Sequence, residues 1–236
     1  MVIESPTNPL AQQEVDPTFK AARINARPLE FVNAAGSQIG GHYRLAAKSG
    51  TLTSAAVVAD GALFSLRWTN PSLLFVLHYL EAYLLPTVVF TAQQEIGLDA
   101  ILASAFTASD SGGTAILPGT SNRARRSNMG ISQVTDMRIA TTSVVTAGTR
   151  TLDANAFAAG SGLVNVVNAA AGTAYVNPGG GDPPFGLRYT PQVDRGEHPI
   201  VLSANEGIVV RNKVIFPAAG AAVLIVNMGW AEVPAY

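Results

Sequence analysis

Cysteine is absent from the 236-residue chain, which excludes disulfides, thiolate metal sites and cysteine nucleophiles together. Histidine occurs only as His42, His78 and His198, and none of the three stands at metal-ligand spacing from another histidine or a carboxylate. Charged residues make up 13% of the chain and hydrophobic residues 48%, so the chain can bury a sizeable core. We therefore expect a folded protein that holds no metal and no other cofactor.

The chain has little net charge and no clear membrane signal. Its formal net charge is −1, so no global attraction to nucleic acid or to an anionic membrane is expected. The apolar stretch 71–90 is long enough for a membrane helix, but His78, Glu81 and Pro86 interrupt it. The first residues lack the apolar core of a secretory signal. We predict synthesis in the cytoplasm and neither a nucleic-acid partner nor a membrane partner.

Most periodic segments alternate in twos, as β-strands do. In residues 95–106, Asp99 falls opposite an apolar face, which predicts a half-buried strand; that face comprises Ile96, Leu98, Ala100 and Leu102. The carboxyl end alternates in the same way, with Leu224, Val226, Met228 and Trp230 on one face. Further candidates are bounded by turn-forming residues; they are 61–68, 73–85, 136–145, 198–203 and 206–216.

These segments predict an all-β fold. Residues 73–85 also suit a helix because of their Leu and Ala content, but we interpret them as a strand. Many strands with turn punctuation and no alternation with helices indicate an antiparallel β-sandwich that is jelly-roll-like. Residues 1–30 carry four prolines and little periodicity, so we predict an extended N-terminal arm there, followed by a sandwich domain over residues 31–236.

One short motif suggests an enzyme. The run Asp110-Ser111-Gly112-Gly113 matches the surroundings of the nucleophile in trypsin-like serine proteases, and His42 and Asp99 precede it in the chain order of that triad. Asp99, however, stands only twelve residues before Ser111, and Ser109 replaces the glycine that helps to build the oxyanion hole. We interpret the run as a polar turn after a strand and predict that the protein is not an enzyme.

A single cluster of basic residues lies in the segment SNRARRSN. Its Arg123, Arg125 and Arg126 could bind phosphates or carboxylates in a bidentate manner. Lys and Arg are sparse elsewhere, and no aromatic residues are interleaved as in proteins that bind single strands. We therefore predict a contact with protein rather than with nucleic acid.

Three segments together resemble a group of tailed-bacteriophage virion proteins of the capsid decoration or cement type. They are AILASAFTASDSGGTA (100–115), SNMGISQVTDMRIATTSVVTAGTRTLDANAF (127–157) and GEHPIVLSANEGIVVRNKVIFPAAGAAVLIVNMGWAEVPAY (196–236). The likeness covers roughly residues 60–236 and lies in the order and spacing of segments. This chain differs from the group in its apolar stretch LLFVLHYLEAYLLPTVVF and in NPGGGDPPFG.

The resemblance implies a β-rich accessory protein that binds and stabilises a shell of major capsid protein, commonly as a homotrimer. The expected location is then the virion capsid. An arm that gains order on docking suits that role. The residues that we expect to make the contacts are Pro9, Phe19 and Arg23 in the arm and the loop arginines Arg123, Arg125 and Arg126.

An alternative is a tail, baseplate or head-fibre component whose sandwich binds a receptor or carbohydrate. Such a site would need exposed aromatic side chains along a groove, and the candidates are Tyr175, Phe185 and Tyr189. We interpret these aromatic residues as core or interface packing. Fold class by itself does not choose between the two roles, because sandwiches carry many functions.

Overall fold

The computed structural model describes residues 3–5, 8–15, 22–23, 41–88, 90, 94–118, 131–164, 186–192, 196–216 and 219–234, the first three ranges by their backbone alone. The named elements in these ranges are all strands. The chain divides into two compact units, Met1–Val32 and Asn33–Tyr236.

The N-terminal unit contains a small antiparallel sheet. Strands β1 (Ile3–Ser5), β2 (Asn8–Val15) and β3 (Ala22–Arg23) pair in that order. Consecutive short strands of this segment thus pair with one another, and the extended N-terminal arm over residues 1–30 stays a prediction. Pairing between neighbours in sequence needs little loop closure.

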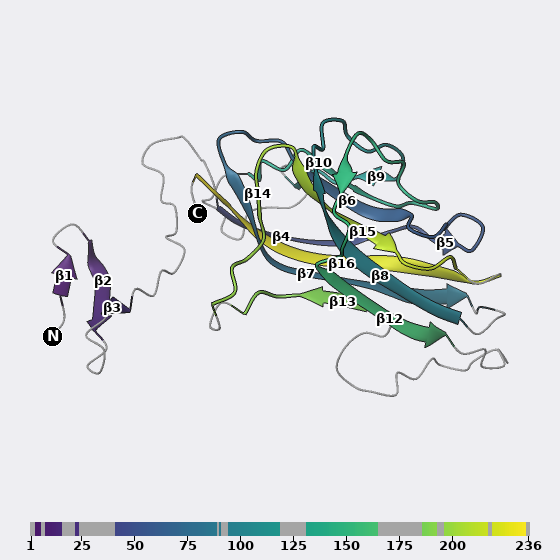
Figure 1. The fold of residues 1–236 in the computed structure, drawn as a ribbon, viewed down its shortest axis with the longest axis horizontal. Coiled ribbons are helices and arrows are strands. Elements are labelled where there is room, and N and C mark those ends of the chain that lie inside the picture. Colours follow the sequence, from purple (N-terminus) through teal and green to yellow (C-terminus); the bar gives the residue numbers. More distant parts are fainter. Residues whose placement is uncertain are drawn as a thin grey trace. The chain divides into compact units, whose positions relative to one another are not determined.

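The larger unit contains two antiparallel sheets (Figure 1). The first sheet has the order β11-β8-β15-β6-β10-β9, and β12 also pairs with β8. Its strands are β6 (Ala62–Trp68), β8 (Gln94–Ser104), β9 (Thr114–Ala115), β10 (Asp136–Ile139), β11 (Thr151–Leu152), β12 (Ala158–Val164) and β15 (Glu206–Asn212).

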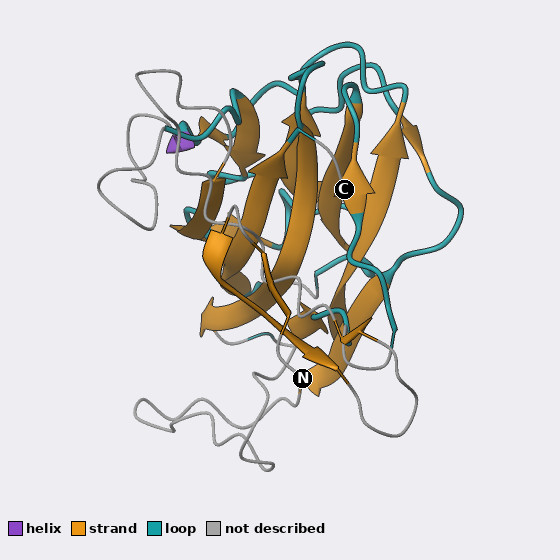
Figure 2. Ribbon diagram, turned by 90° about the vertical axis from the view of Figure 1, so that its left-hand side faces the viewer, coloured by secondary structure: helices purple, strands orange, loops and turns teal. Residues whose placement is uncertain are grey.

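The second sheet has the order β13-β7-β16-β4. Two short strands extend it, since β14 pairs with β7 and β5 pairs with β16. Its strands are β4 (Gly41–Lys48), β5 (Leu52–Thr53), β7 (Leu74–Val88), β13 (Gly186–Tyr189), β14 (Val201–Leu202) and β16 (Ala221–Val233). Figure 2 shows the strands of the molecule in orange, joined by teal loops that gather mainly at the strand ends.

The two sheets pack face to face, which confirms the predicted antiparallel sandwich. Residues 74–85 of the predicted segment 73–85 form the first part of β7, so the strand interpretation was right. Pairing with β16 along β7 overrides the helix-friendly composition. The predicted inner face of β16 is fully buried and comprises Leu224, Val226, Met228 and Trp230. The jelly-roll connectivity stays a prediction.

A row of aromatic rings runs from one sheet to the other. The Trp68 ring on β6 lies 5.7 Å from Phe75 on β7, and Phe75 stacks on Trp230 at 5.7 Å. Trp230 in turn stacks on Tyr43 of β4 at 5.8 Å. Each aromatic side chain buries a large apolar area, and Trp68 and Trp230 have no exposed surface. This row forms the centre of the core.

The first sheet is buried on both faces. Residues such as Leu63, Ile101 and Val209 point away from the second sheet, yet none has exposed surface. Phe106 lies over Gly207 of β15, where a side chain would collide with its ring, so the segment after β8 covers this outer face. The prediction of a half-buried strand at β8 is therefore wrong: Asp99 is only 6% exposed.

One side of the sandwich is closed by close contact between strands of different sheets. β12 of the first sheet runs beside β13 of the second (Figure 1). A Cβ on Gly160 would collide with the backbone carbonyl of Gly186, and the Phe157 and Tyr189 rings meet edge to face at 5.3 Å. Only glycine allows the two backbones to approach this closely.

We predict that Gly160→Ala destabilises the sandwich by about 1–3 kcal/mol, because the added methyl group forces β12 away from β13. The measurement is the urea midpoint of unfolding. Ser161→Ala changes the neighbouring exposed residue of β12 and serves as the control, with an expected change within about 0.5 kcal/mol. Equal stability of the two variants would show that β12 and β13 do not touch at Gly160.

Candidate functional site

The three residues of the suggested protease triad lie apart. His42 is on β4 of the second sheet, where its ring stacks on His78 at 5.3 Å. Asp99 is on β8 of the first sheet and binds Arg211. Ser111 is exposed and pairs through its backbone with Thr146. The geometry does not assemble this triad, and Gly112 and Gly113 with φ of 71° and 58° make the run the tight turn that we predicted.

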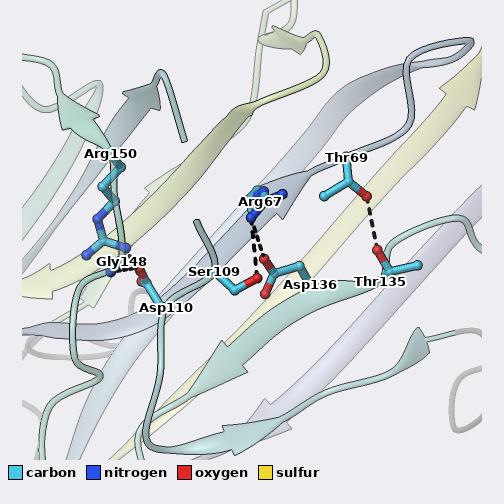
Figure 3. A network of polar contacts seen from close by, with 8 residues as sticks. All are labelled: Arg67, Thr69, Ser109, Asp110, Thr135, Asp136, Gly148 and Arg150. Carbon is cyan, nitrogen blue, oxygen red and sulfur yellow. Dashed lines mark hydrogen bonds and ion pairs between the residues drawn. The ribbon is translucent and has the colours of Figure 1, made fainter. Parts of the chain in front are cut away.

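A group of polar side chains lies on the outer face of the first sheet (Figure 3). Arg67 of β6 donates to the Ser109 hydroxyl at 3.3 Å and pairs with Asp136 of β10 at 3.7 Å. Near it, the hydroxyl groups of Thr69 and Thr135 lie 3.0 Å apart. These contacts attach the segment after β8 to the exposed end of β6 and β10.

Asp110 and Arg150 form a buried ion pair beside this group. Their side chains are only 1% and 5% exposed, and Asp110 also accepts the backbone N–H of Gly148 at 2.8 Å. Arg150 lies over the Phe106 ring, 5.2 Å from its centre, and Arg67 lies 6.0 Å from the same centre. The two cations therefore flank the aromatic ring that covers the sheet.

A second ionic group fixes the opposite end of the same face. The Arg211 guanidinium on β15 binds both carboxylate oxygens of Asp99, at 2.8 and 3.0 Å, and reaches Asp60 at 3.3 Å. The hydrogen bond with Asp99 is the main cause that raises the pKa of Arg211. This bidentate pair joins adjacent strands and holds the turn before β6.

A buried carboxylate joins the two sheets. Glu232 of β16 has no exposed surface. It accepts hydrogen bonds from the Ser132 hydroxyl at 2.6 Å, the Gln133 N–H at 2.9 Å and the Trp230 indole at 3.0 Å. Because Ser132 and Gln133 lead into β10, Glu232 attaches the start of that strand to the second sheet.

Burial controls the protonation of this group. It raises the pKa of Glu232 above the ordinary value of 4.5, although the hydrogen bonds from Ser132, Trp230 and Gln133 lower it. The pKa of Tyr43 is also raised, first by burial and then by the charge of Glu232. A carboxylate with these neighbours serves as a hydrogen-bond acceptor within the core.

The carboxylates in these groups already accept from arginine, from hydroxyl groups or from backbone N–H groups, so their arrangement favours a structural role. Within the described ranges, no three His, Asp or Glu side chains lie close enough together to hold a metal ion. No helix among the described residues has the length and hydropathy of a membrane span.

The residues predicted for partner contact fall mostly beyond these groups. Pro9 lies in β2 and Arg23 in β3, where the backbone alone is described. Phe19 and the loop arginines Arg123, Arg125 and Arg126 lie outside the described residues. Of the aromatic candidates for a carbohydrate site, Tyr189 packs on Phe157 and its hydroxyl accepts the Ile200 N–H, while Tyr175 and Phe185 lie outside the described residues.

Compared with protein-family models, with curated proteins and with solved structures, the chain finds no match.

The polar groups that organise the molecule were missed from the sequence. Asp110 and Arg150 are 40 residues apart, and Ser132 and Glu232 are 100 apart, so no local pattern links them. One signal was available for Glu232, a lone carboxylate in the apolar strand AAVLIVNMGWAEV. A charge at such a position must find partners in the core.

We predict that Asp110→Ala destabilises the protein by about 3–5 kcal/mol, because it leaves the Arg150 charge buried without its partner. Ser111→Ala, the exposed neighbour, should change the free energy of unfolding by less than about 0.5 kcal/mol. Chemical denaturation of both variants provides the measurement. Equal effects would contradict the assignment of Asp110 as the buried anchor of this loop.

We predict a pH dependence that Glu232 causes. Its raised pKa means that the protonated form fits the fold better, so its stabilising contribution is complete below the ordinary carboxyl pKa and is lost as pH rises through the folded pKa. The free energy of unfolding of the native protein should therefore fall with rising pH relative to Glu232→Gln. Glu95→Gln removes an exposed glutamate and is the control. If the native protein instead became more stable relative to Glu232→Gln as pH rises, the predicted sign would be wrong.

Proposed function

We propose that the protein is a non-enzymatic structural protein of a virion, a capsid decoration or cement protein that binds the major capsid protein and stabilises the shell. The sequence resemblance over roughly residues 60–236 supports this proposal, together with the antiparallel sandwich. In this role the protein is made in the host cytoplasm, assembles as a homotrimer and has its place on the capsid.

The observation that carries the proposal is the division of the chain into a sandwich and a separate small N-terminal unit. The sandwich has a continuous aromatic core, and its ionic groups attach its own loops, as with Asp110 and Arg150. A rigid body of this kind can bridge neighbouring subunits without deforming. The N-terminal unit is suited to dock on an adjacent surface, where main-chain pairing provides affinity with little demand on sequence.

The direct test is cosedimentation with empty capsid shells of the same virus. We expect the full-length protein to bind saturably, and removal of residues 1–30 to weaken binding by about tenfold or more. Phe19→Ala and Arg23→Ala in the full-length chain should weaken binding in the same direction. The melting temperature of each form serves as the control for folding. Absence of shell binding by the full-length protein would transfer the role to a tail, baseplate or fibre.

A further inference from the structure

The β4 strand forms a long edge of the second sheet. It pairs with β16 from Gly41 to Lys48 without any shift in register. On its other side, no strand of the described residues pairs with it. At the opposite edge, β13 spans only Gly186–Tyr189 and packs against β12. β4 is therefore the longer and more regular edge of this sheet.

The register shows which backbone groups of β4 face outward. The Ser49 N–H donates to the Leu224 carbonyl, and Lys48 stands opposite Ile225. Because antiparallel pairs alternate, the odd-numbered residues turn their backbone groups to β16. The N–H and C=O groups of Arg44, Ala46 and Lys48 then point away from the sheet. A regular edge without proline or bulge is a template for a further strand.

The side chains of the same three residues determine which strand fits. Arg44, Ala46 and Lys48 are exposed, whereas Tyr43 and Leu45 are buried in the core. β4 carries no carboxylate. If two copies paired through β4 around Ala46, Arg44 of each copy would oppose Lys48 of the other, and like charges directly opposite destabilise a pair of strands. The two cations thus disfavour self-pairing in this register and are complementary to an acidic strand.

We propose that the β4 edge accepts an extended acidic segment of the shell protein, which adds to the second sheet as a strand. The inference rests on the proposed function for the identity of the partner. Main-chain hydrogen bonds at Arg44, Ala46 and Lys48 provide the affinity. The two cations select acidic side chains on the exposed face of the added strand.

The decisive variant is Ala46→Pro in the full-length protein. Proline removes an N–H that points outward and leaves the bonds to β16 intact, so an edge strand tolerates it. We expect about tenfold weaker cosedimentation with empty shells and a melting temperature close to that of the native protein. Ala46→Ser keeps the N–H and is the matched control. If shells bind the native protein and Ala46→Pro equally well, the β4 proposal is overturned while the proposed function stands.

Charge reversal tests the same edge if Ala46→Pro does not fold. Arg44→Glu combined with Lys48→Glu should weaken shell binding by tenfold or more, since repulsion replaces attraction. Lys213→Glu is the control for net charge, because Lys213 is an exposed residue that follows β15. If Lys213→Glu weakened shell binding as much as Arg44→Glu combined with Lys48→Glu, net charge rather than the β4 edge would control binding, and the β4 proposal would be overturned.

A peptide experiment separates the edge from the shell. If the native protein binds no shells, the proposed function fails, and amide hydrogen exchange with a ten-residue peptide of alternating Val and Glu then decides the proposal. Slower exchange at Arg44, Ala46 and Lys48 with this peptide, but not with alternating Val and Lys, supports an acceptor for acidic strands. The proposal is overturned if both peptides slow exchange at these amides equally or if neither peptide slows it. It is also overturned if a high concentration of the protein without peptide slows this exchange.

Discussion

The burial of Trp230 is the interaction on which the rest of the sandwich depends. Its ring stacks between Phe75 and Tyr43, and the contact of Phe75 with Trp68 continues the row into the first sheet. A fully buried indole must place its N–H on an acceptor, and Glu232 fulfils that need at 3.0 Å. Glu232 is therefore buried beside Trp230, and its remaining hydrogen bonds position the segment that leads into β10. Trp230 and Glu232 thus connect the packing of the two sheets with the path of the chain that enters β10.

The second constraint is that the first sheet has no solvent face at its centre. Ile101 and Val209 are buried on the side of the first sheet that points away from the second sheet, so this side requires a cover, and Phe106 provides part of it. A loop packs stably over a sheet only when other contacts hold it in place, because its buried backbone groups need hydrogen-bond partners. The buried pair of Asp110 with Arg150 attaches the segment that follows β8. Such buried pairs add little net stability compared with apolar packing, but they specify one arrangement of the loop.

This use of charge shapes the proposal about function. The ionic side chains of these pairs contact the molecule's own loops and strands. We therefore look to other features, such as sheet edges and the N-terminal unit, for binding to a partner. Arg44 and Lys48 differ from the internal pairs because they are exposed on an edge strand. Sandwich proteins commonly place cations on such edges to prevent pairing with copies of themselves. The same cations leave the edge open to a strand of opposite charge.

The sequence by itself determined the fold class and long strands such as β8 and β16, because alternation along segments such as 95–106 and 222–233 is a local property of the chain. It did not predict β4, β12 or β13. It also determined that Ser111 belongs to a turn, since Gly112 and Gly113 permit the positive φ that a turn requires. Only the tertiary structure decided that Asp99 is buried, that Glu232 meets Ser132 and that β4 is an edge. The reason is physical: exposure and pairing depend on which distant strand or loop arrives as neighbour, and the strand period carries no information about that neighbour.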